Sequence, residues 1–301
     1  MTYIKGVVFV ILATLCWGSG SPIAKLMVAA DIHVISVLII RNVLVASILG
    51  VWLYCIKKED LVSVFRNDMK FYGSVSFFSI MCNTGGYAMS LIYLSTSEAI
   101  ILHYTFPLFT MVISLWAAHE KPVLLDFIAG TLVIVGVYIG VACESYGNRS
   151  GISIAGVLWG LLSVSGISLL VITTREKAKK GDVDQCKILF YGNLFGGFGL
   201  FICKSFFLGW DDIGNLTFFY LTVTMLQAVM STLLAYALFY ASFNCIPATL
   251  VSILSAFEIV VVFLLSAAIV GTFPTLHEII GGLLIIIAII GSTIKGTSKP
   301  I

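Results

Sequence analysis

The sequence predicts an all-α integral membrane protein, with ten transmembrane helices arranged as two inverted-topology repeats of five helices. Three observations support this prediction: an apolar composition, ten long apolar stretches, and a weak internal repeat. Of the 301 residues, 59% are hydrophobic and 11% are charged, and the mean hydropathy is +1.08. Soluble domains are roughly 45–50% apolar and about 25% charged. A single water-exposed domain could therefore not bury so many apolar side chains.

Each of the ten stretches holds the roughly 20 mainly apolar residues that a helix needs to cross a bilayer. The runs are nearly continuous, unlike the alternating pattern of a membrane β-barrel. Lys5 before an apolar run is also typical of a cleaved signal peptide, but the run continues to Met27 without a clear cleavage site, so we expect it to remain as the first span. We place the spans at about 5–28, 33–56, 71–93, 98–118, 122–142, 152–174, 186–208, 217–242, 247–270 and 275–295.

The basic residues predict the orientation of these spans. With the N-terminus inside, thirteen Lys and Arg residues fall on the inner side, nine of them in the linkers around 57–70 and 175–187. Only Arg149 and Lys204 fall on the outer side. Because short cytoplasmic loops carry an excess of Lys and Arg, we expect both termini in the cytoplasm. We therefore expect a multi-pass protein of the cell membrane (the inner or plasma membrane).

Several classes of function are disfavoured by the sequence. The net charge of +2 provides no basic surface for a nucleic acid. The seven cysteines lack the spacing of metal ligands or of a redox motif. Phosphate-binding loops and known catalytic motifs are missing from the sequence, so we expect no metal, no cofactor and no ATP-driven step. We therefore expect a protein that is not an enzyme, with an intramembrane enzyme kept as an alternative class.

The internal repeat relates the two halves of the chain. The segment from Gly6 to Trp17 resembles the one from Gly156 to Gly166, and residues 114–122 match the segment ending at Pro274. These offsets of about 150 residues predict one repeat over 1–143, with helices one to five, and another over 152–296, with helices six to ten. Because each half has an odd number of helices, the second enters the membrane from the opposite side. Transporters with inverted repeats bind substrate near the midplane, where the repeats meet.

Several short motifs lie along the two halves of the chain: Trp17-Gly18-Ser19, Arg41, 93–99, 105–109, Glu120, 130–137, Pro247-Ala248 and 254–258. Together they resemble the drug/metabolite transporter superfamily, EamA type, over essentially the whole chain. Ile259 stands where this family usually has a proline, and Thr272 stands where its second Gly-Glu pair has the acid. The resemblance implies a ten-helix transporter of small polar metabolites, often amino acids or amines, with a central cavity formed by both repeats.

Ionisable side chains within spans are costly and usually face the bundle interior or a water-filled path. Arg41 either pairs with Glu258, Glu98 or backbone carbonyls, or binds an anionic group such as a substrate carboxylate. His103 is either a hydrogen-bonded core residue or a cavity residue suited to proton coupling. Glu258, close to the midplane, is either a structural acid or a carboxylate that binds a substrate ammonium or exchanges protons. Lys25 lies near the outer end of the first span and is expected to reach the interface.

Polar and aromatic residues complete the expected substrate site. The segments 17–22 and 83–87 are rich in glycine and polar residues, and broken helices free backbone groups to bind substrate. Glycine pairs at 136/140, 156/160 and 192/196 are expected to allow close helix packing instead. The remaining candidates for the site are Trp17, Ser19, Asn83, Tyr87, Tyr236, Tyr240 and Ser255.

The leading functional hypothesis is a secondary transporter that moves a small polar metabolite, with an amino acid or an amine favoured, by alternating access. Its partners are a small-molecule substrate and membrane lipid, its coupling to protons is left open, and a monomer is expected. One alternative is an exporter of drugs and other amphiphiles with the same fold. Another is a membrane scaffold that does not transport.

Overall fold

The computed structural model describes residues 2–18, 27, 30–58, 60–61, 68–94, 96–117, 122–142, 153–181, 184–270 and 275–296. Helix α1 (Thr2–Gly18) occupies the start of the predicted first span, whose residues 19–26 lie outside this description. Over the described residues, nine further segments are long and apolar enough to cross a membrane: Val34–Ile56, Met69–Tyr93, Glu98–Ala117, Leu124–Val141, Ile154–Lys180, Gln185–Phe207, Phe218–Ser242, Ala248–Leu265 and Leu276–Ile294.

The spans are built from uninterrupted and interrupted helices. The uninterrupted ones are α9 (Leu124–Ala142), α10 (Ile154–Lys180), α11 (Gln185–Phe207) and α16 (Leu276–Gly296). Three spans combine α-helix with a π-helical segment. The second is α3 (Val34–Val51) followed by the π-helical η1 (Trp52–Ile56). The third is α5 (Met69–Ser76), the π-helical η2 (Phe77–Gly85) and α6 (Gly86–Tyr93), and the eighth is α12 (Phe218–Gln227), the π-helical η4 (Ala228–Leu234) and α13 (Ala235–Ser242). The fourth span comprises α7 (Thr96–His103) and α8 (Phe106–Ala117), and the ninth comprises α14 (Ala248–Ser255) and α15 (Phe257–Val270).

The boundaries agree closely with those expected, with one exception. Helix α10 continues to Lys180, six residues beyond the predicted end at 174, so Arg175 and Lys177 lie on its last turns and not in a linker. Basic side chains stabilise the C-terminal end of a helix, where the backbone dipole is negative. The short helix η3 (Asp211–Asn215) lies between the seventh and eighth spans.

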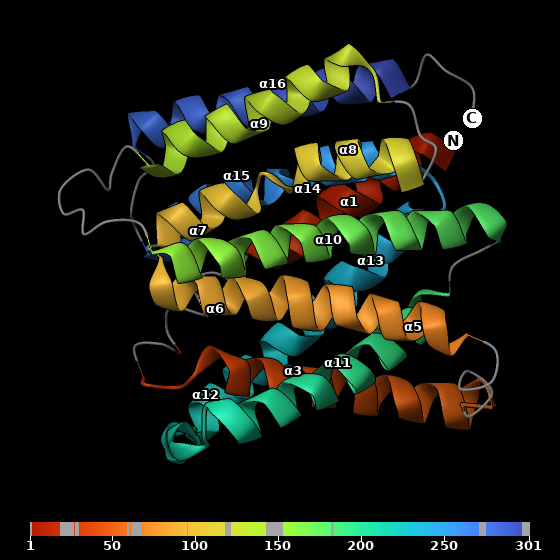
Figure 1. Cartoon of the computed structure of the whole chain (residues 1–301), viewed down its shortest axis with the longest axis vertical. Coiled ribbons are helices and arrows are strands. Elements are labelled where there is room, and N and C mark those ends of the chain that lie inside the picture. The colour runs from red at the N-terminus through yellow and green to blue at the C-terminus, as the bar shows by residue number, and fades with distance from the viewer. Residues whose placement is uncertain are drawn as a thin grey trace.

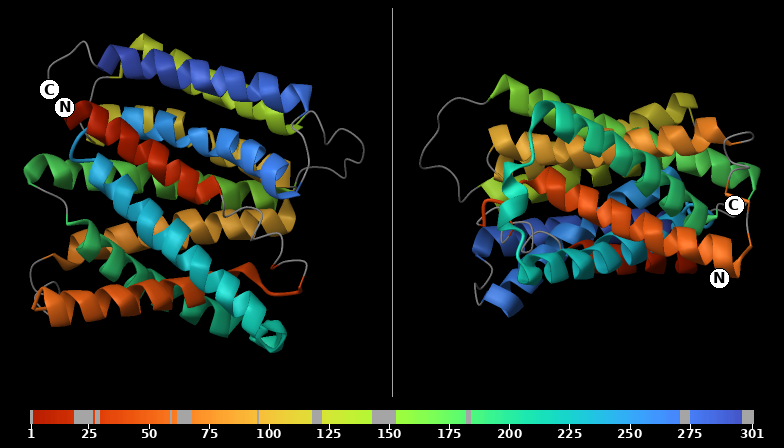
Figure 2. Two further views of the ribbon diagram at one scale, coloured as in Figure 1. Left: turned by 180° about the vertical axis from the view of Figure 1, so that it is seen from behind. Right: turned by 90° about the horizontal axis from the view of Figure 1, so that it is seen from below.

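The helices run side by side, with α9 and α16 at one edge and α3 with α11 at the other (Figure 1). Seen from behind, the same pairs again lie at the two edges (Figure 2). The starts of α1 and the end of α16 lie at the same end of the bundle (Figure 1). The shared end agrees with the even number of spans predicted from the sequence, because an even number of crossings returns the chain to the side of the membrane on which it began.

The two halves interlock through equivalent contacts. Helix α1 of the first half packs on α13 of the second, and α10 of the second half packs on η2 and α6 of the first. Gly6 on α1 lies against Cys245, and Gly156 on α10 lies against Leu94, which is 151 residues before Cys245. The repeat seen in the sequence therefore also relates the packing of the first and sixth spans.

Two kinds of helix irregularity recur at this same offset. The fourth span is interrupted at Tyr104 and Thr105, and the ninth is interrupted at Ala256, 152 residues after Tyr104. The π-helical segments η2 and η4 begin at Phe77 and Ala228, which are 151 residues apart. These matched interruptions place the same backbone feature in both halves of the membrane domain.

The break in the fourth span has a local cause in the sequence. Pro107 has no backbone N–H, and its ring disfavours a continuous helix through the preceding turn. The ninth span carries Ile259 at the equivalent position and is broken nevertheless, with tight three-residue turns from the Ala256 N–H to the Ile253 carbonyl (3.2 Å) and from the Ile259 N–H to the Ala256 carbonyl (3.1 Å). The break in the ninth span therefore forms without a proline.

Glycines allow close approach of helices at most of the expected positions. A Cβ atom on Gly281 of α16 would meet the backbone of Gly136 and Gly140 on α9, and one on Gly136 would lie 2.7 Å from the Gly281 carbonyl oxygen. Gly160 similarly lies against Leu102, and Gly196 lies against Ile80. Gly192 has open space at its Cβ position, so the expected packing role is wrong for that residue.

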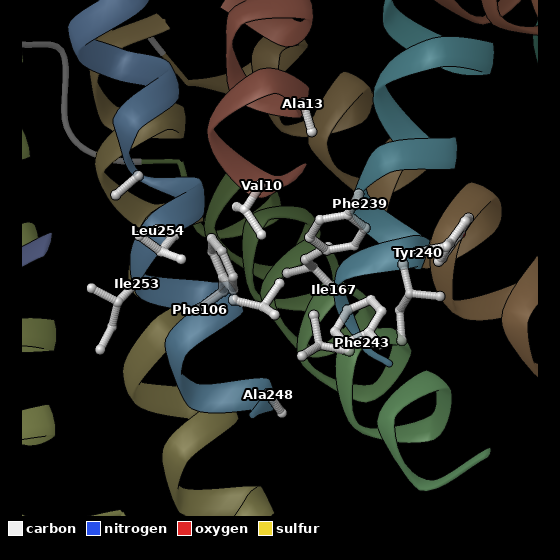
Figure 3. Packing of buried hydrophobic residues seen from close by; sticks show 14 of the residues in the cluster. Val10, Ala13, Phe106, Ile167, Phe239, Tyr240, Phe243, Ala248, Ile253 and Leu254 are labelled. Atoms are coloured by element: carbon white, nitrogen blue, oxygen red, sulfur yellow. The ribbon is translucent and has the colours of Figure 1, made fainter. Parts of the chain in front are cut away.

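A buried apolar core lies beside the helix breaks. Val10 of α1, Phe106 of α8, Ile167 of α10, Phe239 of α13 and Leu254 of α14 are all buried and belong to one cluster (Figure 3). Side chains from both repeats therefore meet there. This core fixes the positions of the two breaks relative to each other.

Candidate functional site

The two helix breaks are joined by a hydrogen bond. The Tyr104 hydroxyl, in the fourth-span break, donates to Glu258 Oε2 over 3.0 Å. Glu258 lies in the first turn of α15, two residues after Ala256, and its side chain is only half-buried. Its Oε1 atom has no hydrogen-bond donor among the described residues. The carboxylate therefore keeps acceptor capacity about midway along its span.

Arg41 occupies the second span and is held by a threonine. Its Nε and Nη2 atoms donate to Thr232 Oγ1 over 3.1 and 2.6 Å, and Thr232 belongs to η4. In the described part of the chain, no carboxylate lies within 4 Å of the guanidinium, so the alternative of pairing with Glu258 or Glu98 is not formed. The positive charge of Arg41 is therefore positioned but not neutralised by these residues.

His103 ends α7 and begins a short chain of hydrogen bonds. Its Nδ1 atom lies 3.1 Å from Ser163 Oγ, and that hydroxyl donates to Asn83 Oδ1 over 3.2 Å. The Tyr87 ring lies against the imidazole, with 5.0 Å between the ring centroids. Two other spans, the third and the sixth, therefore contribute to the surroundings of His103.

An aromatic group connects the first and eighth spans beside these polar residues. The Trp17 Nε1–H donates to the Ser231 carbonyl over 3.1 Å, and its ring lies 5.0 Å from that of Tyr236. The Tyr236 hydroxyl is hydrogen-bonded to Thr84 and lies close enough to Arg41 and Glu258 for both charges to influence it. These interactions connect Arg41 and Glu258 with the aromatic residues in one site.

Ser255 is not brought into this group, and Tyr240 reaches it only through its ring, whose centroid lies 5.8 Å from that of Tyr236. Tyr240 is 3% exposed and its hydroxyl is hydrogen-bonded to Ser79, within the aromatic core. Ser255 is 5% exposed and donates to the Val251 carbonyl of its own helix over 2.8 Å. Ser19 lies outside the described residues, as does Lys25.

Three residues that contact the site were not predicted: Tyr104, Ser163 and Thr232. Tyr104 could have been found, because it directly precedes the Thr105-Phe106-Pro107 motif and therefore lies where proline interrupts the helix. Ser163 and Thr232 look like ordinary small polar residues of apolar helices. Their roles depend on which helix face meets the site, and this is set by packing between the two halves.

The π-helical segments explain in part which polar side chains face the site. In η2, the Thr84 hydroxyl donates to the carbonyl of Ser79, five residues earlier, over 2.9 Å. One widened turn rotates the following residues around the helix axis, and such turns are frequent at functional sites. Segment η2 carries Asn83 and Thr84, and η4 carries Ser231 and Thr232. Both irregular segments therefore present polar groups to the site.

A separate ionic cluster closes the end of the bundle opposite the described termini. Lys204 is 1% exposed and donates to Asp212 Oδ1 over 2.9 Å, while Ser36 Oγ and the His33 N–H donate to Asp212 Oδ2 over 2.5 and 3.0 Å. Burial favours the neutral form of Asp212, but these hydrogen bonds and the Lys204 charge outweigh it and lower the pKa of Asp212. The cluster ties the start of α3 to the end of α11.

Comparison with known proteins identifies the family. The profile of the EamA-like transporter family matches residues 4–141 and again residues 154–294. A protein of known crystal structure superposes with a TM-score of 0.78 at 14% sequence identity, over 97% of this chain and 98% of that chain, which shows a shared fold. No curated protein matches the sequence. With both halves matched, the chain is a multi-pass membrane protein that belongs to the EamA-like transporter family.

Proposed function

We propose that this protein is a secondary transporter of a small polar metabolite, with an amino acid or an amine favoured, in the cell membrane. The observation that carries the proposal is the pair of charged residues Arg41 and Glu258. Both are half-buried within spans, and neither has an oppositely charged partner within 4 Å among the described residues. Charges in a membrane are costly unless they serve a ligand or a partner.

The chemistry of the two groups suggests the ligand. A carboxylate such as Glu258 accepts hydrogen bonds from an ammonium group, and a guanidinium such as Arg41 matches the geometry of a carboxylate. The neutral phenol of Tyr236 lies near both charged groups, which supports their belonging to one site. A zwitterionic amino acid would satisfy both groups at once, whereas a simple amine would satisfy Glu258 alone.

The backbone supports an alternating-access mechanism. Two interlocking halves with inverted topology are the arrangement in which many transporters rock around a fixed central site. The breaks beside Tyr104 and Ala256 interrupt equivalent spans next to Glu258, and such interruptions can absorb changes in backbone dihedrals. A proton would compete with an ammonium for Glu258, so we propose exchange of protons for substrate. A monomer contains both halves and would suffice.

A second candidate function is export of lipophilic cations. The Trp17 and Tyr236 rings lie against each other with centroids 5.0 Å apart, and the Tyr87 ring lies against His103. Aromatic faces attract cations, most strongly where water is excluded. This candidate shares Glu258 with the first one but has no use for the charge of Arg41.

Counterflow in proteoliposomes separates the candidates. Purified protein is reconstituted and preloaded with unlabelled amino acids, choline-like amines, nucleosides, sugar phosphates or lipophilic cations, and uptake of the labelled compound is measured. We expect accumulation of an amino acid or amine by wild-type protein and its loss in Glu258→Gln. Accumulation of lipophilic cations alone would favour the exporter. A folded protein that exchanges none of these compounds would contradict transport of such metabolites.

A further inference from the structure

We propose that Ser163 and Asn83 hold neutral His103 in a single tautomer, with a proton on Nδ1 and a lone pair on Nε2. In this role they are positioning residues that make the His103 side of the site specific for a hydrogen-bond donor, such as an ammonium group. The proposed preference for a hydrogen-bond donor rests on the proposed function, whereas the proposed tautomer of His103 does not depend on it.

The geometry places three polar groups in series. His103 Nδ1 lies 3.1 Å from Ser163 Oγ, and Ser163 Oγ lies 3.2 Å from Asn83 Oδ1. Ser163 is fully buried and Asn83 is 6% exposed, so water does not offer either of them alternative partners. The first distance lies in the usual range for a nitrogen–oxygen hydrogen bond, and the second is a long hydrogen bond between two oxygens.

Counting protons along the series gives the tautomer. A serine hydroxyl has one proton, and an amide oxygen can only accept. The Ser163 proton is therefore used on Asn83 Oδ1, which leaves only lone pairs of Ser163 Oγ for the imidazole. His103 Nδ1 must then carry a proton. Because a neutral imidazole has one N–H, Nε2 is left as an acceptor.

The other ring nitrogen is the one available to a ligand. His103 is half-buried, and in the described part of the chain Ser163 is the only hydrogen-bond partner of its ring. The neighbouring Tyr104 has its ring centroid 5.5 Å away, and its hydroxyl proton is already used on Glu258. Among the described residues, His103 Nε2 and Glu258 both remain as acceptors, and Tyr104 offers no free donor.

The positioning groups are themselves rigidly placed. Ser163 and Asn83 belong to α10 and η2, which come from different halves and pack backbone to backbone. A Cβ atom on Gly166 would lie 2.6 Å from the backbone nitrogen of Asn83, and one on Gly86 would lie 3.0 Å from the backbone nitrogen of Ser163. This contact keeps Ser163 between Asn83 and His103. A loosely held serine could turn its hydroxyl toward His103 and permit the opposite tautomer.

The tautomer is tested by nitrogen NMR of histidine-labelled wild-type protein in lipid nanodiscs at neutral pH. The chain has four histidines, and the signal of His103 is assigned by its loss in His103→Gln. We expect a protonated Nδ1 and an unprotonated Nε2 in the protein without ligand. A proton on Nε2 instead, or an equal mixture of tautomers, would overturn the proposal whether or not the protein transports anything.

Specificity is tested with two compounds that share the carbon skeleton of leucine: isoamylamine, which lacks the carboxylate, and 4-methylvalerate, which lacks the ammonium. The variant Ser163→Ala is compared with Ser168→Ala, which removes another buried hydroxyl of α10, one that donates to the Phe106 carbonyl. We expect Ser163→Ala to weaken isoamylamine binding by about tenfold, as for loss of one buried hydrogen bond, and to mix the His103 tautomers. Ser168→Ala should do neither.

The outcomes separate this inference from the proposed function. A fixed tautomer together with unchanged isoamylamine affinity in Ser163→Ala would overturn the specificity role and leave transport standing. A fixed tautomer without binding of either compound or of leucine to the wild-type protein would contradict the proposed substrate class. Tighter binding of 4-methylvalerate than of isoamylamine to wild-type protein would overturn the assigned preference for a donor.

Discussion

Tyr104 and Glu258 form a hydrogen bond of 3.0 Å that connects the break of the fourth span with the start of α15 in the ninth. The two breaks are equivalent in the repeat, but their side chains are not: Ala256 stands where the first half has Tyr104, and Ser255 stands where it has His103. A symmetric backbone thus carries an asymmetric set of polar groups. The acidic group is present only in the second half, and its partner is present only in the first.

Replacing Tyr104 by Phe removes the donor to Glu258 while keeping the ring. A hydrogen bond to a charged group contributes about 1.5–3 kcal/mol, so we expect isoamylamine binding to weaken by roughly tenfold or more as the carboxylate loses its fixed orientation. Isothermal titration calorimetry measures this. Tyr191→Phe is the control, because it also loses a buried hydroxyl, one that donates to the Leu61 carbonyl far from the site. Equal affinities in the two variants would argue against a role for Tyr104 in ligand binding.

Arg41→Gln tests whether the guanidinium binds a carboxylate. If it does, leucine should bind the variant at least about tenfold more weakly, from loss of a charge-assisted pair, whereas isoamylamine should bind almost as before. Competition for a labelled ligand gives both affinities. A parallel loss for both compounds would instead assign Arg41 a structural role through Thr232, to which its Nε and Nη2 donate.

The contact between α9 and α16 predicts opposite results for two glycines of one helix. A Cβ atom on Gly281 would lie 2.8 Å from the Gly140 nitrogen, whereas one on Gly291 has open space. We expect Gly281→Ala to destabilise the protein by about 1–3 kcal/mol through overpacking, seen as a lower midpoint of thermal unfolding in detergent. Gly291→Ala should leave the midpoint unchanged or raise it, because alanine favours helix. Similar midpoints for the two variants would contradict the close contact.

The ionic cluster at Asp212 predicts a pH-dependent contribution to stability. The folded-state pKa of Asp212 lies below its ordinary value of 3.8, so its stabilisation is complete above that value and is lost as the pH falls through the lower, folded-state pKa. Asp212→Asn leaves Lys204 buried without its counter-ion, at a cost of about 3–5 kcal/mol. The difference in unfolding midpoint between wild type and variant should be constant from about pH 7 to pH 5 and shrink below about pH 4. A difference that persists at acid pH would contradict the ionised state of Asp212.

Much of the fold could be predicted from the sequence because the bilayer imposes it. Spans of the required length and apolarity leave little freedom, and the boundaries agree with those expected except at α10, whose basic last turns look like a linker. The break in the fourth span follows from Pro107. The break at Ala256 could not be predicted in the same way, because Ile259 can continue a helix.

The candidate site was predicted in part. Glu258, Arg41, His103 and Asn83 stand out as polar side chains in apolar runs, and Trp17 was found through its motif. Tyr104 could have been found beside Pro107, but the roles of Thr84 and Thr232 could not be predicted, because the widened turns of η2 and η4 shift the helix face on which these two residues lie. Hydrophobic periodicity carries no signal for a π-helical turn. Of the alternatives left open for Arg41, pairing with Glu258 is not formed, and the guanidinium is held by Thr232 instead.

The central claim is that Glu258 binds the ammonium group of a small substrate, and ligand-induced thermal stabilisation tests it most directly. Purified wild-type protein and Glu258→Gln are heated with leucine, isoamylamine or 4-methylvalerate at millimolar concentration, since a ligand of the folded state stabilises it by RT ln(1 + [L]/Kd). The account predicts a raised midpoint for the wild type with isoamylamine and leucine, lost in Glu258→Gln. An equal rise in the variant would contradict it.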